Sequence, residues 1–167
     1  NLKFLHIAPE YCFLKIFKKM KNLDYLSADL NSPWADIKMD VHNIQFDDNS
    51  FDVVICNHVL EHVDDSDKVM GEFFRVMKPG GWGIFQVPID YNNPNTIEDK
   101  SITDPRERER LYWQSDHLRL FGRDYGKRLA SAGFNVTESN YINEIDPQLV
   151  ERYALDKNEI IYFCQKI

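Results

Sequence analysis

The stretch from residue 51 to residue 88 constrains the fold of this chain more than any other. Residues 52–56 (D-V-V-I-C) form an apolar run without alternation, which is typical of a strand buried on both faces. Apolar residues then recur at helical spacing until a K-P-G-G sequence ends the helix at residues 78–81. A second apolar run follows at residues 82–87. Strand, crossover helix and strand together predict a βαβ unit, and hence a parallel sheet.

The rest of the chain continues this alternation. Strands are predicted at residues 2–7, 23–28, 37–41, 134–138 and 160–165, and helices at residues 11–21, 105–113 and 122–132. Residues 89–103 are polar and irregular, and residues 117–121 alternate apolar with polar side chains. We therefore expect an α/β fold with an open, doubly wound sheet and an insert at about residues 89–121.

Composition limits the class of protein. A chain of 167 residues suits a single domain, 1–167, and a net charge of −7 disfavours a nucleic-acid partner, which needs a basic face. Three widely spaced cysteines favour a reducing compartment, so we expect a cytoplasmic protein. No apolar run is long enough to predict a membrane span. Because the chain enters a strand directly, without an initial Met, we expect a missing upstream segment; the sequence does not predict an oligomeric state.

A family resemblance lies in the same central stretch. The run D-N-S-F-D-V-V-I-C-N-H-V-L-E-H-V at residues 48–63, followed by F-F-R-V-M-K-P-G-G at residues 73–81, resembles the class I S-adenosylmethionine-dependent methyltransferases, in particular the type 11 branch that acts on small molecules. The likeness extends from about residue 2 to residue 166. It implies a Rossmann-like, mostly parallel seven-stranded sheet with helices on both faces and an antiparallel last strand. It also implies S-adenosyl-L-methionine as cofactor and a small-molecule acceptor.

The ends of the predicted strands nominate the cofactor-binding residues. Asp29, with Leu30 after it, follows the second strand at the spacing where a carboxylate meets ribose hydroxyls. By resemblance, Asp40 would accept from the adenine amino group, with the backbone of Val41 beside the ring. Each acid has a plainer alternative role as a turn residue. The resemblance places the methionine moiety and the acceptor opening near Asn57 and His58, which close the fourth strand.

The first turn departs from the family pattern. Where the family shows an acid and glycines, this chain reads H-I-A-P-E at residues 6–10, and its first glycine is Gly71. We expect His6, Ala8 and Glu10 to line the cofactor site, with a buried core role as the alternative for His6. Either Glu10 replaces the missing acid and pairs with the ammonium of the methionine moiety, or the pocket has degenerated.

Three histidines are the catalytic candidates. His58, His62 and His117 have side chains that can orient or deprotonate an acceptor near neutral pH, and Glu61 lies among them in the sequence. His117 resembles the histidine of an H-x-R-x-F segment that faces the substrate side in relatives. Arg119, in the same segment, is interpreted as a surface ion-pair residue, with an acidic substrate group as the alternative partner.

A competing motif overlaps the same residues. His58-Val59-Leu60-Glu61-His62 matches H-x-x-E-H, which on a helix would place two histidines on one face as zinc ligands, with the glutamate as base. The preceding buried strand and the K-P-G-G ending favour the methyltransferase interpretation, so we expect no metal. The leading hypothesis is methyl transfer to a small molecule. A methyltransferase-like binding or scaffold domain without turnover is the alternative, and a zinc hydrolase is a remote one.

Overall fold

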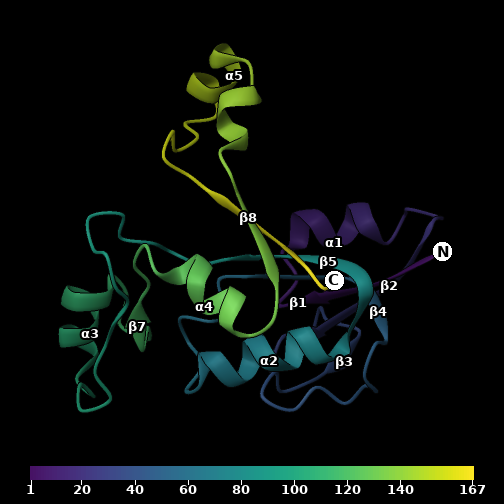
Figure 1. The fold of residues 1–167 in the computed structure, drawn as a ribbon, viewed down its shortest axis with the longest axis horizontal. Coiled ribbons are helices and arrows are strands. Elements are labelled where there is room, and N and C mark those ends of the chain that lie inside the picture. Colours follow the sequence, from purple (N-terminus) through teal and green to yellow (C-terminus); the bar gives the residue numbers. More distant parts are fainter.

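The computed structural model describes residues 1–167 and is built around one seven-stranded sheet in the order β3-β2-β1-β4-β5-β9-β8 (Figure 1). All neighbouring strands pair in parallel except β9, which runs antiparallel to both β5 and β8. The predicted fold class is therefore confirmed. The strands are β1 (Leu2–Ile7), β2 (Leu23–Asp29), β3 (Ile37–Lys38), β4 (Phe51–Asn57), β5 (Met77–Gln86), β8 (Asn135–Ser139) and β9 (Ile161–Gln165).

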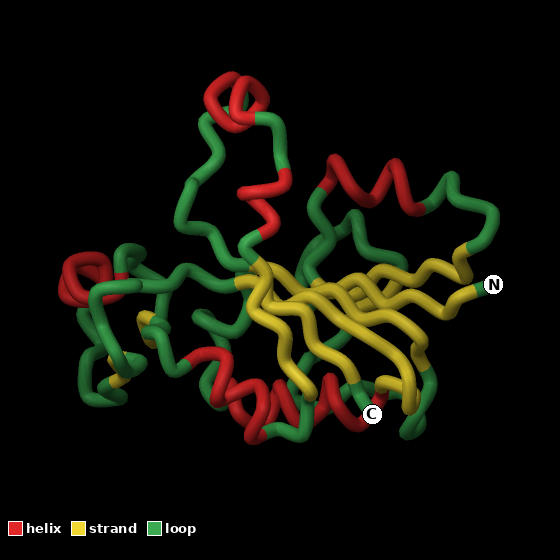
Figure 2. Tube along the Cα trace, turned by 45° about the horizontal axis from the view of Figure 1, so that its top comes forward, coloured by secondary structure: helices red, strands yellow, loops and turns green.

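Helices cover both faces of the sheet (Figure 2). Helix α1 (Tyr11–Phe17) packs on one face, over a small core that includes Phe4, Val53 and Ile55. Helices α2 (Ser66–Val76) and α4 (Tyr125–Ser131) lie on the other face, over the larger core. Helix α2 begins where the Asp65 side chain accepts from the backbone N–H of Lys68, an N-cap that satisfies a free donor of its first turn.

Several predicted boundaries are shifted in the structure, and local turns account for the early ends of α1 and β3. Helix α1 ends at Phe17 and not at residue 21. Beyond Phe17 the backbone hydrogen bonds change to the tighter 3-10 type, as in the bond from the Lys19 N–H to the carbonyl of Ile16, and the chain then turns into β2. Strand β3 ends at Lys38, because the Asp40 side chain closes a turn. Strand β5 begins at Met77, so K-P-G-G belongs to an irregular first part of the strand.

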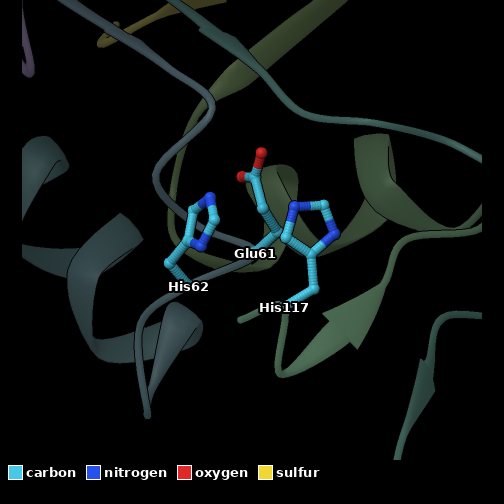
Figure 3. A group of neighbouring side chains, drawn as sticks. All are labelled: Glu61, His62 and His117. Carbon is cyan, nitrogen blue, oxygen red and sulfur yellow. The ribbon is translucent and has the colours of Figure 1, made fainter. Parts of the chain in front are cut away.

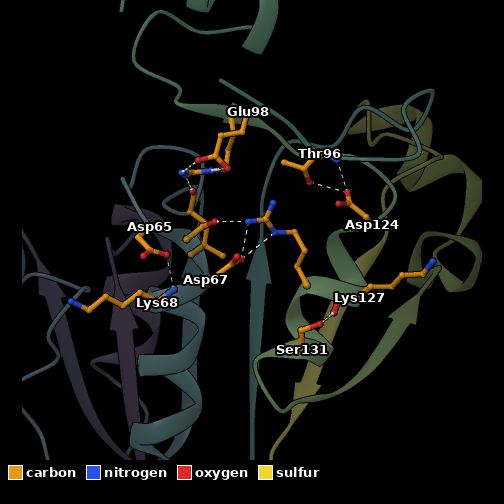
Figure 4. Close-up of polar contacts among 12 residues, drawn as sticks. Asp65, Asp67, Lys68, Thr96, Glu98, Asp124, Lys127 and Ser131 are labelled. Atoms are coloured by element: carbon orange, nitrogen blue, oxygen red, sulfur yellow. Dashed lines mark hydrogen bonds and ion pairs between the residues drawn. The ribbon is translucent and has the colours of Figure 1, made fainter. Parts of the chain in front are cut away.

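The insert forms a small unit of its own beside the sheet. Strands β6 (Ile97–Glu98) and β7 (Arg119–Leu120) pair antiparallel, with α3 (Pro105–Tyr112) between them. Asp104 caps α3, with Pro105 in the first turn of the helix. The insert is tied to α4 by the backbone N–H and the hydroxyl of Thr96, which both donate to Asp124 (Figure 4).

The interpretation of Arg119 as a surface ion-pair residue is wrong. Its side chain is 1% exposed and donates to the backbone carbonyls of Leu60, Val63 and Asp64, and it pairs with Glu98 at 3.0 Å. Five donors in a rigid fork allow one guanidinium to satisfy several carbonyls at once. Arg119 therefore fastens the insert to the loop that follows β4.

An arm between β8 and β9 has no counterpart in the predicted elements. It contains the 3-10 helix η1 (Tyr141–Glu144) and helix α5 (Pro147–Arg152), and it projects from the sheet (Figure 1). Helix α4 also differs from its predicted range, because it begins at Tyr125 and not at residue 122. None of the helices has both the length and the apolar composition that crossing a lipid bilayer requires.

Candidate functional site

A cleft of about 470 Å³ lies beyond the carboxyl ends of the central strands. This is the edge at which open parallel sheets bind ligands, and the volume suits a small organic molecule. The structure brings Asp29 and Asp40, which follow different strands, to this one cleft. The lining residues are Ile7, Ala8, Asp29, Leu30, Met39, Asp40, Val41, His42, His58, Val59, His62, Val63 and Asp64.

The two carboxylates are held in the same way. Oδ1 of Asp29 accepts from the backbone N–H groups of Asn31 and Ser32, at 2.7 and 2.6 Å. Oδ1 of Asp40 accepts from the backbone N–H of His42 at 2.9 Å, and Nδ1 of the same histidine lies 2.8 Å away. The backbone bond from His42 is the main cause of a lowered pKa for Asp40. Each acid thus uses Oδ1 to fix its own turn, and Oδ2 remains to accept from a ligand.

The glycine-free first turn keeps a backbone conformation that glycine usually provides. Ala8 has φ of 48°, in the left-handed region, and its N–H bonds to the carbonyl of Ala28 at 2.8 Å. An alanine there is strained by its Cβ, although the chain still passes close to the cleft. The departure from the family pattern therefore changes the side chain at this point more than the path of the backbone.

Glu10 lies behind that turn and is fixed from two sides. Its carboxylate meets Nε2 of His6 at 2.7 Å and accepts from Nδ2 of Asn57 at 2.8 Å. Burial alone would raise the pKa of Glu10, but the hydrogen bonds from His6 and Asn57 outweigh it and lower the pKa to about 2. Oδ1 of Asn57 is buried without a partner. An anionic carboxylate and an unused amide oxygen side by side are suited to a cationic donor.

His6 itself does not line the cleft. Its side chain is fully buried, and Nδ1 lies 2.9 Å from the hydroxyl of Tyr25 while Nε2 meets Glu10. Its environment is the aromatic core under α1, with Phe17 edge-on at 5.7 Å between ring centroids. The structure therefore favours the core role that the sequence left open, and His6 acts by holding Glu10.

The segment after β4 is a loop, which removes the basis of the H-x-x-E-H zinc motif. His58 has φ of 55°, so the strand ends in a left-handed residue, and the loop continues with a turn bond from His62 N–H to the carbonyl of Val59. Residues 58–64 contain no helix, and the shared helical face that the motif requires does not exist. His58 and His62 both line the cleft, whereas Glu61 is buried behind them.

His117 reaches this loop from the insert. The backbone N–H of Leu118 donates to the carbonyl of Glu61 at 2.8 Å, which sets the two segments side by side. The His117 side chain is only 4% exposed, so it stands behind the cleft wall and not at its surface. Its ring packs edge-on against His62, with 4.7 Å between centroids.

Sequence reasoning missed several residues of the cleft wall. His42 had no role assigned, and its only sequence signal is its place two residues after Asp40. Met39 and Val63 form apolar walls and Asp64 stands at the rim, but nothing in their spacing marks them as ligand contacts. These side chains are brought in by loops whose course depends on the packed sheet.

The residues present fit S-adenosylmethionine. A nucleoside needs acceptors for ribose hydroxyls and an adenine amino group, and Oδ2 of Asp29 and of Asp40, both residues of the cleft lining, are acceptors of that kind. A methionine ammonium needs an anionic acceptor; Glu10 and Asn57, predicted as cofactor contacts, are not in the cleft lining, but the Glu10 carboxylate and the unpaired Asn57 oxygen lie close to the Ala8 turn and have that chemistry. No cation lines the cleft to compete for these carboxylates other than the histidines.

Comparison with known proteins agrees with this fit. Residues 11–85 match the family model described as a methyltransferase domain. The sterol 24-C-methyltransferase of Schizosaccharomyces pombe is 32% identical over 150 residues, which cover 85% of this chain and 37% of that protein. Together, the family match, the methyltransferase relatives and the fold support a class I S-adenosylmethionine-dependent methyltransferase domain. The chain spans well under half the length of that curated relative. The activity and substrate of the relative are therefore not assigned to this chain.

Solved structures show the same fold at low identity. The 1,6-didemethyltoxoflavin-N1-methyltransferase of Burkholderia thailandensis superposes with a TM-score of 0.66 at 12% identity, over 99% of this chain and 71% of that one. Phosphoethanolamine N-methyltransferase 2 of Haemonchus contortus, solved in complex with S-adenosyl-L-methionine, gives 0.61 at 15% identity, over 98% of this chain and 48% of that one. At such identities the likeness concerns the fold alone.

Proposed function

We propose that this chain is a methyltransferase domain that binds S-adenosylmethionine in the cleft and transfers its methyl group to a small molecule. The observation that carries the proposal is the meeting of Asp29 and Asp40 at one cleft, each with one oxygen committed to its own turn. Two such acceptors beside an apolar wall are what an adenine nucleoside requires.

The residues of this chain would divide the binding between them. Asp29 would accept from the ribose diol, Asp40 from the adenine amino group, and Val41 would lie beside the ring. Glu10 and Asn57 would take the ammonium end, with His6 holding the carboxylate of Glu10 in place. Leu30 and Ala8 form part of the wall between these two ends.

The cofactor would supply a methyl group already activated by its sulfonium. The protein's part is then to orient the acceptor and exclude water. His58 and His62 line the cleft from the loop after β4, and their side chains are 64% and 31% exposed. We assign them to acceptor orientation. His117 is buried, so its contribution would come through His62 rather than by direct contact.

Calorimetric titration with nucleosides tests the binding part of the proposal. Adenosine, S-adenosylhomocysteine and S-adenosylmethionine should all bind at one site per chain. Inosine, which lacks the amino group, and 2′-deoxyadenosine, which lacks one ribose hydroxyl, should each bind about tenfold or more weakly than adenosine, because each leaves a carboxylate oxygen without its donor. Equal affinity for all three nucleosides would contradict the assignments of Asp29 and Asp40.

Methyl release to a panel of acceptors then separates an enzyme from a binding domain. The glycine-free turn, with Pro9 removing a donor, is the observation that favours the alternative of a methyltransferase-like scaffold without turnover. Tight cofactor binding with no methyl release on any acceptor, in a chain of the natural length, would support that alternative. Release of S-adenosylhomocysteine only when acceptor is present would support the enzyme.

A further inference from the structure

Glu61, His62 and His117 form a cluster at the cleft, with His62 in the cleft lining and the side chains of Glu61 and His117 buried behind it. One possible ligand atom from each lies within 4.8 Å of the other two. Figure 3 shows the carboxylate of Glu61 between the two imidazole rings, with a ring nitrogen of each histidine on its side. Glu61 and His62 come from the loop after β4, and His117 comes from the insert.

Glu61 is a buried carboxylate without a hydrogen bond. The residue is 1% exposed, and neither Oε1 nor Oε2 has a hydrogen bond within the protein. Nδ1 of His58 lies 3.3 Å from Oε1, outside hydrogen-bond geometry but at ion-pair distance, and this contact with Glu61 raises the pKa of His58. A buried carboxylate left in this state is strongly unfavourable unless a cation neutralises it. His58 compensates Oε1 in part, but neither oxygen is hydrogen-bonded, so the site still favours a cation at the Glu61 carboxylate.

The Nδ1 contacts of both histidines favour the tautomer in which Nε2 of the neutral ring carries a lone pair. Nδ1 of His117 lies 2.7 Å from the carbonyl oxygen of Tyr112, which can only accept, so Nδ1 carries the proton and Nε2 is free. Nδ1 of His62 lies 3.3 Å from Oδ2 of Asp116, which favours the same tautomer. Metal-binding histidines typically show this arrangement, with the outer nitrogen held by a carbonyl or carboxylate.

We propose that Glu61, His62 and His117 bind a divalent transition-metal ion such as Zn²⁺, Co²⁺ or Mn²⁺. Two imidazoles with one carboxylate favour these ions over Mg²⁺ and Ca²⁺, which prefer all-oxygen ligands. Three protein ligands leave a coordination position open, as in catalytic zinc sites. Since His62 lines the cleft, an ion held by these residues would lie at the cleft wall.

This site differs from the zinc motif suggested by the sequence. In the H-x-x-E-H interpretation His58 and His62 bind the ion from one helix and Glu61 is a base. Here the segment is a loop, Glu61 is a ligand, and His117 replaces His58. The loop is held in place by Arg119 through three backbone carbonyls, so the geometry rests on a rigid, buried support.

Metal binding is tested directly, without reference to turnover. Chelator-treated protein, in a Cys12→Ser background because Cys12 is an exposed thiol, is titrated with Zn²⁺ and Mg²⁺ by calorimetry and with Co²⁺ by visible absorption. We expect one Zn²⁺ per chain, bound at least 100-fold more tightly than Mg²⁺, and a Co²⁺ spectrum typical of nitrogen and oxygen ligands. Failure of methyl transfer would leave this result unaffected.

Variants locate the ion. Glu61→Gln and His62→Gln should each weaken Zn²⁺ binding at least tenfold, whereas His42→Gln, which changes a histidine of the same cleft outside the cluster, should change it less than twofold. Far-ultraviolet circular dichroism checks folding, and His62→Gln, at a partly exposed position, carries the test if Glu61→Gln does not fold. Absence of stoichiometric binding, or equal losses in His42→Gln and His62→Gln, would overturn the proposal.

Discussion

The two sides of the cleft are built on opposite principles. On the side of β2 and β3, Asp29 and Asp40 are each fixed by backbone N–H groups no more than three residues away, and Asp40 is half-exposed. On the side of β4, Glu61, His62 and His117 come from segments far apart in the sequence, and two of the three are buried. One side is assembled locally and the other only by tertiary contacts.

The difference has consequences for how each side fails. Mutation of Asp29 or Asp40 should weaken ligand binding but change the stability of the fold little, because each side chain bonds only to nearby backbone groups. The side with the histidines depends on the buried guanidinium of Arg119, which joins the insert to the loop after β4. A mutation of Arg119 should therefore destabilise the fold as a whole. The following changes test this contrast, from the largest expected effect to the smallest.

Arg119→Met should lower the free energy of unfolding by about 3–5 kcal/mol, because it leaves buried carbonyls and the Glu98 carboxylate without their donor. Urea unfolding measures the change. Arg123→Met is the matched control, since Arg123 is exposed, and it should stay within about 0.5 kcal/mol. Similar small losses in both variants would show that the insert is not held by Arg119.

Asp29→Ala should weaken adenosine and S-adenosylmethionine binding by about 1–3 kcal/mol, the usual cost of losing hydrogen bonds to a charged group. The free energy of unfolding should change less than in Arg119→Met, because the Asp29 bonds are local. Asp24→Ala, an exposed acid at the opposite end of β2, is the control and should leave affinity unchanged. Calorimetry on both variants gives the comparison.

Glu10→Gln should remove a pH-dependent part of stability. Because folding lowers the pKa of Glu10 from 4.5 to about 2, its ionised form stabilises the protein above pH 4.5, and this contribution is lost as pH falls toward 2. Allowing for its partial exposure, we expect about 1–2 kcal/mol at pH 7. The difference in unfolding free energy between wild type and variant should shrink steadily between pH 5 and pH 2.5 (roughly the window set by the two pKa values); a constant difference would exclude this linkage.

Ala8→Gly should raise the free energy of unfolding by about 0.5–1 kcal/mol, since glycine adopts the left-handed conformation without strain. Ala154→Gly is an informative partner, because Ala154 also has a positive φ, of 50°, but lies in the arm away from the cleft. Both variants should gain stability, and only Ala8→Gly should alter cofactor affinity. A loss of stability in both would show that the strain is smaller than the entropy that glycine adds to the unfolded chain.

Much of the fold could be read from the sequence because its signals are local. The unalternating run before Asn57, the helical spacing of α2 and the K-P-G-G ending predicted a βαβ unit, and the family and fold predictions are confirmed. The errors lie where a side chain closes a turn, as Asp40 does after β3. The arm of η1 and α5 escaped prediction because its short helices carry no clear periodicity.

By itself, the sequence determined the parallel sheet, the family and the carboxylates at two strand ends, because strand pattern and strand-end position are properties of neighbouring residues. Only the tertiary structure decided that Arg119 is buried, that His6 serves Glu10, and that His117 meets Glu61 and His62. The physical reason is that burial and pairing depend on which distant segments pack together, and no local pattern in this chain encodes that contact.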